Sequence, residues 1–147
     1  MFKGNNMNEE IILKSEDGVG IITLNRPERL NALTYNIVKK MNNFLDKCES
    51  DDDIKCVIIE GAGEKAFCAG GDVVSLRKQV LDEGGPPTEL SEKFFYDEYL
   101  LNYKINNFTK PYIALIDGVT MGGGVGVSMH GSHICLLYTS PSPRDTA

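Results

Sequence analysis

Two runs of apolar and polar residues near the start of the chain are rich in β-forming residue types and predict β-strands at 11–15 and 19–25. Asp17-Gly18 lies between them, and this dipeptide favours the tight turn that joins antiparallel neighbours. The first part of the chain therefore predicts a β-hairpin.

Apolar residues recur at steps of three and four after Thr34, which is the spacing of one face of a helix. The positions concerned are Ile37, Val38, Met41, Phe44, Leu45 and Cys48. Thr34 is of a type favoured at a helix N-cap. This segment therefore predicts a helix that packs one face on a sheet.

Two later runs, at 56–59 and 112–116, are apolar without interruption, which is typical of strands buried on both faces. Three further helices are predicted: from Asp72 to about residue 81, at 90–108 and at 122–131. The alternation of strands and helices indicates a layered α/β domain.

The composition suits a globular domain, because 41% of the 147 residues are hydrophobic, enough to bury a core. The formal net charge of −6 argues against binding to nucleic-acid phosphates or to an anionic membrane surface. No apolar run approaches the roughly 20 residues that span a bilayer. We therefore expect neither nucleic-acid nor membrane partners.

The four cysteines and two histidines form no zinc-ligand spacing and no CxxC pair. We expect no metal site, and we interpret the cysteines as mostly buried, reduced thiols. The first residues show neither the apolar core of a signal peptide nor the Arg-rich bias of a transit peptide, which favours an intracellular protein.

Two glycine-rich segments carry the candidate chemistry, KAFCAGGD at 65–72 and MGGGVG at 121–126. Small residues let backbone N–H groups approach a ligand atom without obstruction by side chains. The second segment lies where a predicted strand turns into a helix, so its free N–H groups and the positive end of the helix dipole point the same way. Two separate donors aimed at one oxygen would form an oxyanion hole for a carbonyl group.

The first glycine-rich segment also permits two simpler interpretations. GAGEKA at 61–66 matches a loose dinucleotide-binding fingerprint, but the loop does not run directly into a helix and follows at least two earlier strands. An ordinary glycine-rich connection, with Asp72 as a helix cap, would also account for the residues. The second glycine cluster favours the oxyanion hole.

Glu98 is the third candidate. On its predicted helix it shares a face with Phe94, Leu101 and Ile105, and no basic residue stands three or four positions away. Such a carboxylate either turns to solvent at the edge of the apolar face or is held in a site for its chemistry. The pattern alone leaves both possibilities open.

Three strings resemble the enoyl-CoA hydratase/isomerase, or crotonase, superfamily in the same order: LNRPERLNAL, CVIIEGAGEKAFCAGGD and KPYIALIDGVTMGGGVGVSMHG. The resemblance covers about residues 11–132. It implies an α/β fold built as a crotonase-like spiral of ββα units. It also implies an acyl-CoA substrate, so that coenzyme A is part of the substrate and no separate cofactor is needed.

The same resemblance assigns roles to individual positions. The oxyanion-hole donors would be the N–H groups of Ala69, or alternatively Gly70, and of Gly123. Substrate-binding positions implied by the resemblance are Glu98, Gly123, Gly70, Gly71 and Asp72.

Within the superfamily, AFCAGGDVVSL and FFYDEYLLN resemble in particular the 3-hydroxyisobutyryl-CoA hydrolases of valine breakdown. Hydratases that resemble this chain carry a catalytic glutamate two residues past the glycine triplet, where this chain has Gly126. The resemblance therefore implies a thioester hydrolase. A hydratase or isomerase of the same superfamily and a non-catalytic acyl-CoA binder are the alternatives, and the oligomeric state stays open.

The end of the chain changes character, because LLYTSPSPRDTA is rich in Ser, Thr and Pro and has no periodicity. We therefore expect a truncated crotonase-like domain at 9–133 and a non-native tail, resembling translated adapter or cloning sequence, at 134–147. The resemblance implies a mitochondrial location, although no transit peptide is visible and a cytoplasmic or peroxisomal location stays possible.

We expect the chain as printed to show no hydrolase activity. The resemblance puts the catalytic glutamate and aspartate of the hydrolases in PET and PDVGG segments, and neither string occurs here. The measurement is release of free coenzyme A from 3-hydroxyisobutyryl-CoA by the purified 147-residue chain. Turnover at an ordinary enzymatic rate would contradict the expectation.

Overall fold

The computed structural model describes residues 9–85 and 88–137. Within them, a five-stranded sheet has the order β1-β2-β3-β5-β7, and β4 and β6 form a separate two-stranded sheet. β1 and β2 form the predicted antiparallel hairpin, and β3, β5 and β7 continue the sheet in parallel. The strands of the large sheet are β1 (Ile11–Glu16), β2 (Val19–Leu24), β3 (Cys56–Gly61), β5 (Tyr112–Ile116) and β7 (His133–Leu136).

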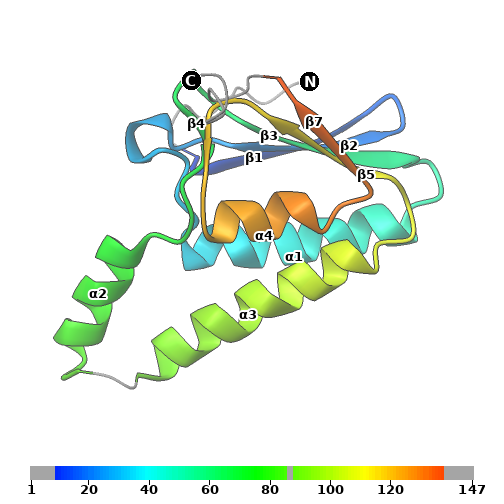
Figure 1. Ribbon diagram of the computed structural model, residues 1–147. Helices are drawn as coiled ribbons and strands as arrows, with labels where there is room; N and C mark the ends of the chain where they lie inside the picture. The colour runs from blue at the N-terminus through cyan, green and yellow to red at the C-terminus, as the bar shows by residue number, and fades with distance from the viewer. Residues whose placement is uncertain (1–8, 86–87, 138–147) are drawn as a thin grey trace.

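Three helices cover one face of this sheet, and a fourth stands away from it (Figure 1). The covering helices are α1 (Tyr35–Ser50), α3 (Glu89–Asn106) and α4 (Gly123–Met129), and the outlying one is α2 (Val73–Asp82). The Thr34 hydroxyl accepts a hydrogen bond from the Ile37 N–H at 3.2 Å, as expected of an N-cap. All six apolar positions predicted for the face of α1 are buried.

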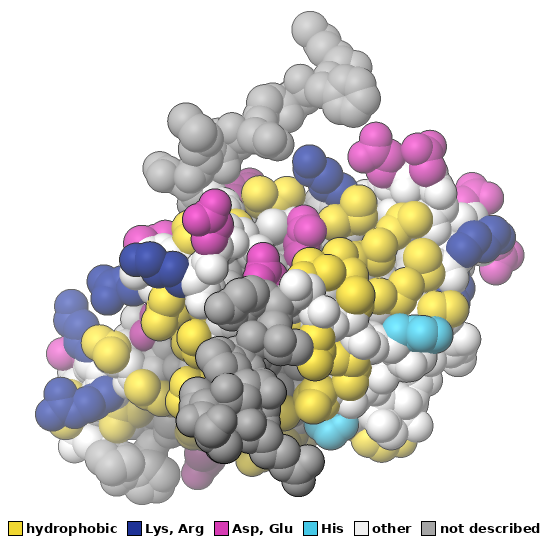
Figure 2. Space-filling model, turned by 45° about the horizontal axis from the view of Figure 1, so that its top comes forward, with side chains coloured by type: hydrophobic (Ala, Val, Ile, Leu, Met, Phe, Trp, Pro, Cys, Tyr) yellow, Lys and Arg dark blue, Asp and Glu magenta, His cyan; other side chains and the backbone are white. Residues whose placement is uncertain are grey.

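The strands β3 and β5 are not buried equally on both faces, which corrects the prediction from their apolar runs. Val57 and Ile59 are fully buried against the helices, whereas Ile58, Ile113 and Leu115 alternate with buried neighbours and are half-buried. The reason is that the helices of the described residues cover one face only. Figure 2 looks obliquely onto the other face and shows hydrophobic side chains gathered there.

The fold continues past residue 133, where the sequence analysis ends the domain. Residues His133–Leu136 form β7, which pairs in parallel with β5 from Ile113 opposite His133 to Ile116 opposite Leu136. Whether residues 134–147 belong to the natural protein stays a prediction, and 138–147 lie outside the described residues.

The connection between β2 and α1 is a compact turn centred on Asn31. It begins with a short 3-10 helix, η1 (Pro27–Arg29), and its residues Leu30 and Asn31 adopt the left-handed conformation, with φ of 52° and 55°. The Asn31 side chain is fully buried and donates from Nδ2 to the carbonyls of Ala62 and Ala66, at 2.9 and 2.8 Å. Its Oδ1 accepts from the Arg26 N–H at 2.9 Å.

We predict that Asn31→Ala lowers the free energy of unfolding by about 2–4 kcal/mol, because it leaves buried backbone groups unpaired and places alanine at a positive φ. Urea unfolding followed by circular dichroism measures the change. The matched control is Asn43→Ala on the exposed side of α1, which should be neutral or slightly stabilising because alanine favours helix. Equal losses in both variants would contradict the assignment.

Candidate active site

The two glycine-rich segments lie side by side because β4 (Ala66–Cys68) pairs in parallel with β6 (Val119–Thr120). Directly after the pairing, the Met121 N–H donates to the Cys68 carbonyl at 3.0 Å. A Cβ at position 124 would overlap that same carbonyl, so only glycine lets α4 start here. The first residues of α4 are thereby fixed against the end of β4.

The loop after β4 is held on its other side by the segment that precedes α1. The Ala69 N–H donates to the Leu30 carbonyl at 2.9 Å, and the Leu33 N–H donates to the Gly70 carbonyl at 2.7 Å. The Asp72 N–H completes the bridge by donating to the Leu33 carbonyl at 2.8 Å. Three backbone hydrogen bonds therefore fix the loop before any ligand is present.

Ala69 cannot serve as the free oxyanion-hole donor, which corrects that prediction, because its N–H is already bonded to the Leu30 carbonyl. The structure favours Gly71 in its place: a Cβ built on Gly123 would lie 3.4 Å from the Gly71 nitrogen. Across residues 9–85 and 88–137, neither the Gly71 N–H nor the Gly123 N–H has an acceptor. These two groups are the pair that can meet one oxygen.

Gly70 makes the close approach of the two segments possible. Its φ is +106°, a conformation that strains any residue with a side chain, and a Cβ there would lie 3.2 Å from the Met121 carbonyl and 3.4 Å from the Gly123 nitrogen. The predicted site positions Gly70, Gly71 and Gly123 are thus brought together by the fold.

Glu98 reaches the same place from α3. A Cβ on Gly123 would overlap the Glu98 Oε1 atom, so the carboxyl lies directly beside the second donor. Among the described residues, this half-buried carboxyl has no ion pair and no hydrogen bond. Burial raises its pKa. Of the two possibilities left open by the sequence, the structure selects the side chain held at the site.

Asp72 supports the loop and is not a free substrate ligand, which corrects its predicted role. Its Oδ1 accepts from the Ser75 N–H at 3.0 Å as the cap of α2, and its Oδ2 pairs with the Arg26 guanidinium at 2.9 Å. Burial alone would raise the pKa of Asp72, but the hydrogen bonds from Ser75 and Arg26 outweigh it and lower the pKa. The helix cap and the ion pair with Arg26 together explain why a carboxylate stands at position 72.

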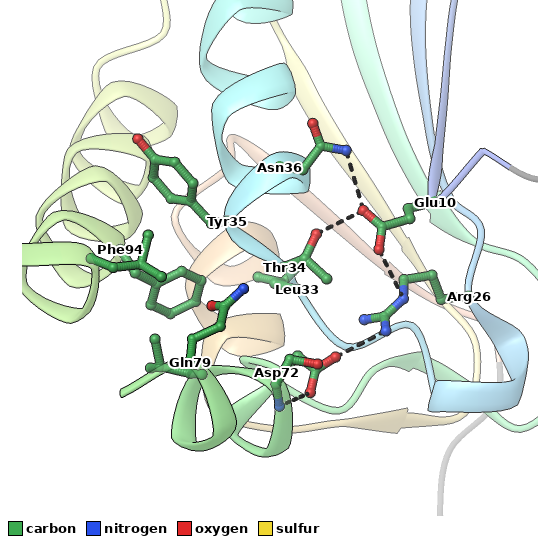
Figure 3. Close-up of a pocket in the computed structure, with 12 residues that line it drawn as sticks. Glu10, Arg26, Leu33, Thr34, Tyr35, Asn36, Asp72, Gln79 and Phe94 are labelled. Atoms are coloured by element: carbon green, nitrogen blue, oxygen red, sulfur yellow. Dashed lines mark hydrogen bonds and ion pairs between the residues drawn. The ribbon is translucent and has the colours of Figure 1, made fainter. Parts of the chain in front are cut away.

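Arg26 links this cap to the N-terminal hairpin, as Figure 3 shows. Its Nη1 donates to the Ala32 carbonyl at 2.7 Å, and its Nε lies 3.5 Å from the Glu10 carboxylate, which also accepts from Thr34. Sequence reasoning missed Arg26 and Asn31 as supporting residues, although both stand in the string LNRPERLNAL. The left-handed turn at Leu30 and Asn31 contains no glycine, so no residue type signals clearly that the backbone turns there.

A cavity of about 370 Å³ adjoins the glycine pair. Its wall residue Leu33 lies 3.1 Å from a Cβ built on Gly123, and its wall residue Phe94 lies 3.4 Å from one built on Gly71. The cavity is lined on one side by apolar side chains such as Leu33 and Phe94 and on the other by the Glu10–Arg26–Asp72 network (Figure 3). It can take part of a ligand whose carbonyl lies at the glycine pair.

Three further features of the described part of the chain bear on the sequence predictions. No group of three or more His, Cys, Asp or Glu side chains there could hold a metal ion, and no helix there is long and apolar enough to cross a membrane. Cys68 lies near the loop, but burial raises the pKa of its thiol to about 11, which makes it a poor nucleophile at neutral pH.

The chain matches a known family profile and solved structures of similar fold. A family profile described as enoyl-CoA hydratase/isomerase matches residues 19–137. The chain belongs to the enoyl-CoA hydratase/isomerase family. Its crotonase-like α/β fold is shared with a carnitinyl-CoA dehydratase from Mycobacterium thermoresistibile (TM-score 0.79, 43% identity, 85% of this chain and 36% of that one). An enoyl-CoA hydratase from Rhodobacter sphaeroides 2.4.1 is similar too (TM-score 0.80, 35% identity, 86% and 36%).

Curated relatives of this family member are named 3-hydroxyisobutyryl-CoA hydrolase, mitochondrial. The protein from Danio rerio is 48% identical over 122 residues, which are 83% of this chain and 31% of the relative. The one from Homo sapiens is 46% identical over 132 residues, 89% of this chain and 33% of the relative. The chain therefore spans about a third of the length of the curated relatives it matches.

We predict that Glu98→Gln stabilises the protein at pH 7 and not at pH 3.5. A carboxyl whose folded pKa is raised makes folding less favourable once the pH exceeds its unfolded pKa, near 4.3, and has no such effect below it. The neutral amide removes this penalty, so Tm should rise by a few degrees at pH 7 only.

Thermal unfolding at both pH values tests this prediction, with Glu92→Gln on the exposed side of the same helix as the control. The control should give no gain at either pH. A Glu98→Gln variant that is less stable than the parent at pH 7 would show that the carboxylate serves the fold and not the site.

Proposed function

We propose that the protein is an acyl-CoA thioester hydrolase that acts on 3-hydroxyisobutyryl-CoA in valine breakdown, and that this chain supplies its carbonyl-binding site. The observation that carries the proposal is the convergence of two free N–H groups, of Gly71 and Gly123, beside the Glu98 carboxyl. Identity of 46–48% to relatives named as this hydrolase supports the choice of substrate.

The proposed chemistry is polarisation of the thioester carbonyl. Its oxygen accepts hydrogen bonds from both N–H groups, which strengthen as negative charge develops on the oxygen in the tetrahedral transition state. Because the loop is already held by backbone hydrogen bonds, little reorganisation is needed at that moment. The group that attacks the carbonyl carbon is activated by carboxylates. The family resemblance implies that these carboxylates stand in segments that this sequence does not contain.

Gly126 separates this proposal from hydration of an enoyl thioester. A hydratase of this family needs an acid/base group in the site, and the residue at the position expected for it has no side chain. Instead, the α4 backbone at this point faces the amide of Asn102. We infer that acyl transfer to water is favoured over addition of water to a double bond.

The relatives' names also support a location for the protein. Both curated relatives described above are named mitochondrial, and we propose that the protein acts in mitochondria, where it would meet acyl-CoA substrates. A fluorescent fusion of the complete protein, compared with a matrix marker, tests the location.

We predict that the complete protein hydrolyses 3-hydroxyisobutyryl-CoA faster than it hydrates crotonyl-CoA, when both are assayed side by side. Gly123→Ala should lower kcat for hydrolysis about 100-fold, because the new Cβ overlaps Glu98 and displaces one donor of the hole. The control is Asn43→Ala on the exposed side of α1, away from the glycine pair, and kcat should stay unchanged.

The assay results separate the competing functions. Faster hydration of crotonyl-CoA would identify a hydratase and refute the proposal. Tight binding of both thioesters without turnover would identify a non-catalytic acyl-CoA binder.

A further inference from the structure

Asn102 occupies the space that a side chain at position 126 would need. It stands one helical turn after Glu98 on α3 and faces α4. A Cβ built on Gly126 would lie 2.7 Å from both Oδ1 and Nδ2 of Asn102, closer than such atoms can approach. Any side chain at position 126 must therefore displace the Asn102 amide.

The amide is held in this place without satisfying its own hydrogen-bonding capacity. Its Oδ1 is shielded from solvent and has no donor anywhere in the described part of the chain. A buried amide oxygen without a hydrogen-bond donor costs a free energy comparable to that of a lost hydrogen bond. Its retention at this place points to a donor that a bound ligand supplies.

Asn42 offers an instructive contrast, because its Oδ1 is also buried and unpaired in the described residues. However, the Asn42 Nδ2 donates to the carbonyls of Val38 and Asp97, which ties α1 to α3. These two hydrogen bonds explain why an asparagine stands at position 42. No such side-chain bond explains Asn102 within residues 9–85 and 88–137.

The position of Asn102 relative to the carbonyl site follows from helix spacing. Glu98 and Asn102 are four residues apart on α3, and the glycines they face, Gly123 and Gly126, are three apart on α4. The amide therefore lies about one turn, roughly 5 Å, beyond the second N–H donor of the hole. An acyl chain that extended along α4 from a carbonyl bound in the hole would therefore reach the amide.

We propose that Asn102 determines specificity by accepting a hydrogen bond at Oδ1 from a hydroxyl group on the acyl chain. The inference rests on the proposed function, since it takes the thioester carbonyl to lie between Gly71 and Gly123. A hydroxyl group supplies the donor that the buried oxygen lacks, whereas an alkyl group leaves it unpaired. Gly126 is then required so that the amide can stand against the α4 backbone.

The test compares two ligands that differ only by the hydroxyl group. Dissociation constants are measured by calorimetry for non-hydrolysable analogues of 3-hydroxyisobutyryl-CoA and isobutyryl-CoA, in which a methylene group replaces the thioester sulfur. The parent protein should bind the hydroxylated analogue about tenfold more tightly. Asn102→Leu should bind the two analogues equally, with its affinity for the isobutyryl analogue changed less than about twofold.

Two further variants control for folding. Gly126→Ala leaves Asn102 in the sequence but displaces its amide, and it should also reduce the preference for the hydroxylated analogue. Asn106→Leu changes an exposed asparagine one turn further along α3 and should keep the parent's preference. Thermal unfolding of each variant establishes that it is folded, and Gly126→Ala decides the matter if Asn102→Leu does not fold.

The outcomes for this inference and for the proposed function are distinguishable. If the parent binds both analogues equally, or if Asn102→Leu keeps the parent's preference, the role of Asn102 is wrong while the hydrolase proposal stands. If the parent binds neither analogue, the carbonyl site itself is wrong and both proposals fall.

Discussion

The candidate site depends on the short parallel pairing of β4 with β6. This pairing joins two glycine-rich segments that lie about fifty residues apart in the chain, and the Met121–Cys68 hydrogen bond extends it to the first turn of α4. Without this pairing, nothing would hold the Gly71 and Gly123 N–H groups close to one point. The absence of a side chain at Gly124 is part of the same constraint, because α4 rests on the Cys68 carbonyl.

A second set of contacts makes this arrangement rigid. The buried Asn31 amide and the Arg26 guanidinium hold the segment before α1, and that segment in turn binds the loop after β4 through Leu30 and Leu33. The loop is thus held by backbone hydrogen bonds on both sides and by the Arg26–Asp72 ion pair at its end. Donors fixed in this way are suited to stabilising developing charge, because they need not be reoriented during the reaction.

The polar side chains near α4 suggest how one family fold can serve different reactions. Glu98 is half-buried beside the carbonyl-binding donors, where desolvation raises its pKa, and Asn102 fills the space beside Gly126 one turn further on. Loss of one side chain from α4 and its replacement by an amide from α3 would change the chemistry while the backbone stays the same. On the proposed function, the lack of a side chain at Gly126 disfavours hydration, and the Asn102 amide that takes its place serves substrate choice.

Local sequence determined much of the secondary structure and the identity of the family. The Asp17-Gly18 turn, the Thr34 cap with its six apolar positions and the face shared by Glu98 and Leu101 all follow from spacing along one segment. The glycine clusters likewise predicted two segments whose backbone N–H groups could approach one ligand atom. These features need only residues that are neighbours in the chain, which is why periodicity and turn chemistry can reveal them.

Tertiary structure alone decided which atoms form the site. Ala69 and Gly71 are only two residues apart, but one N–H is bonded to the Leu30 carbonyl and the other is left free, a difference set by a segment some forty residues earlier. The cap role of Asp72 was visible in the sequence, but its ion pair with Arg26 was not, and the one-sided burial of β3 and β5 follows from where the helices pack. Hydrogen-bond partners and burial arise between distant segments, so no local pattern records them.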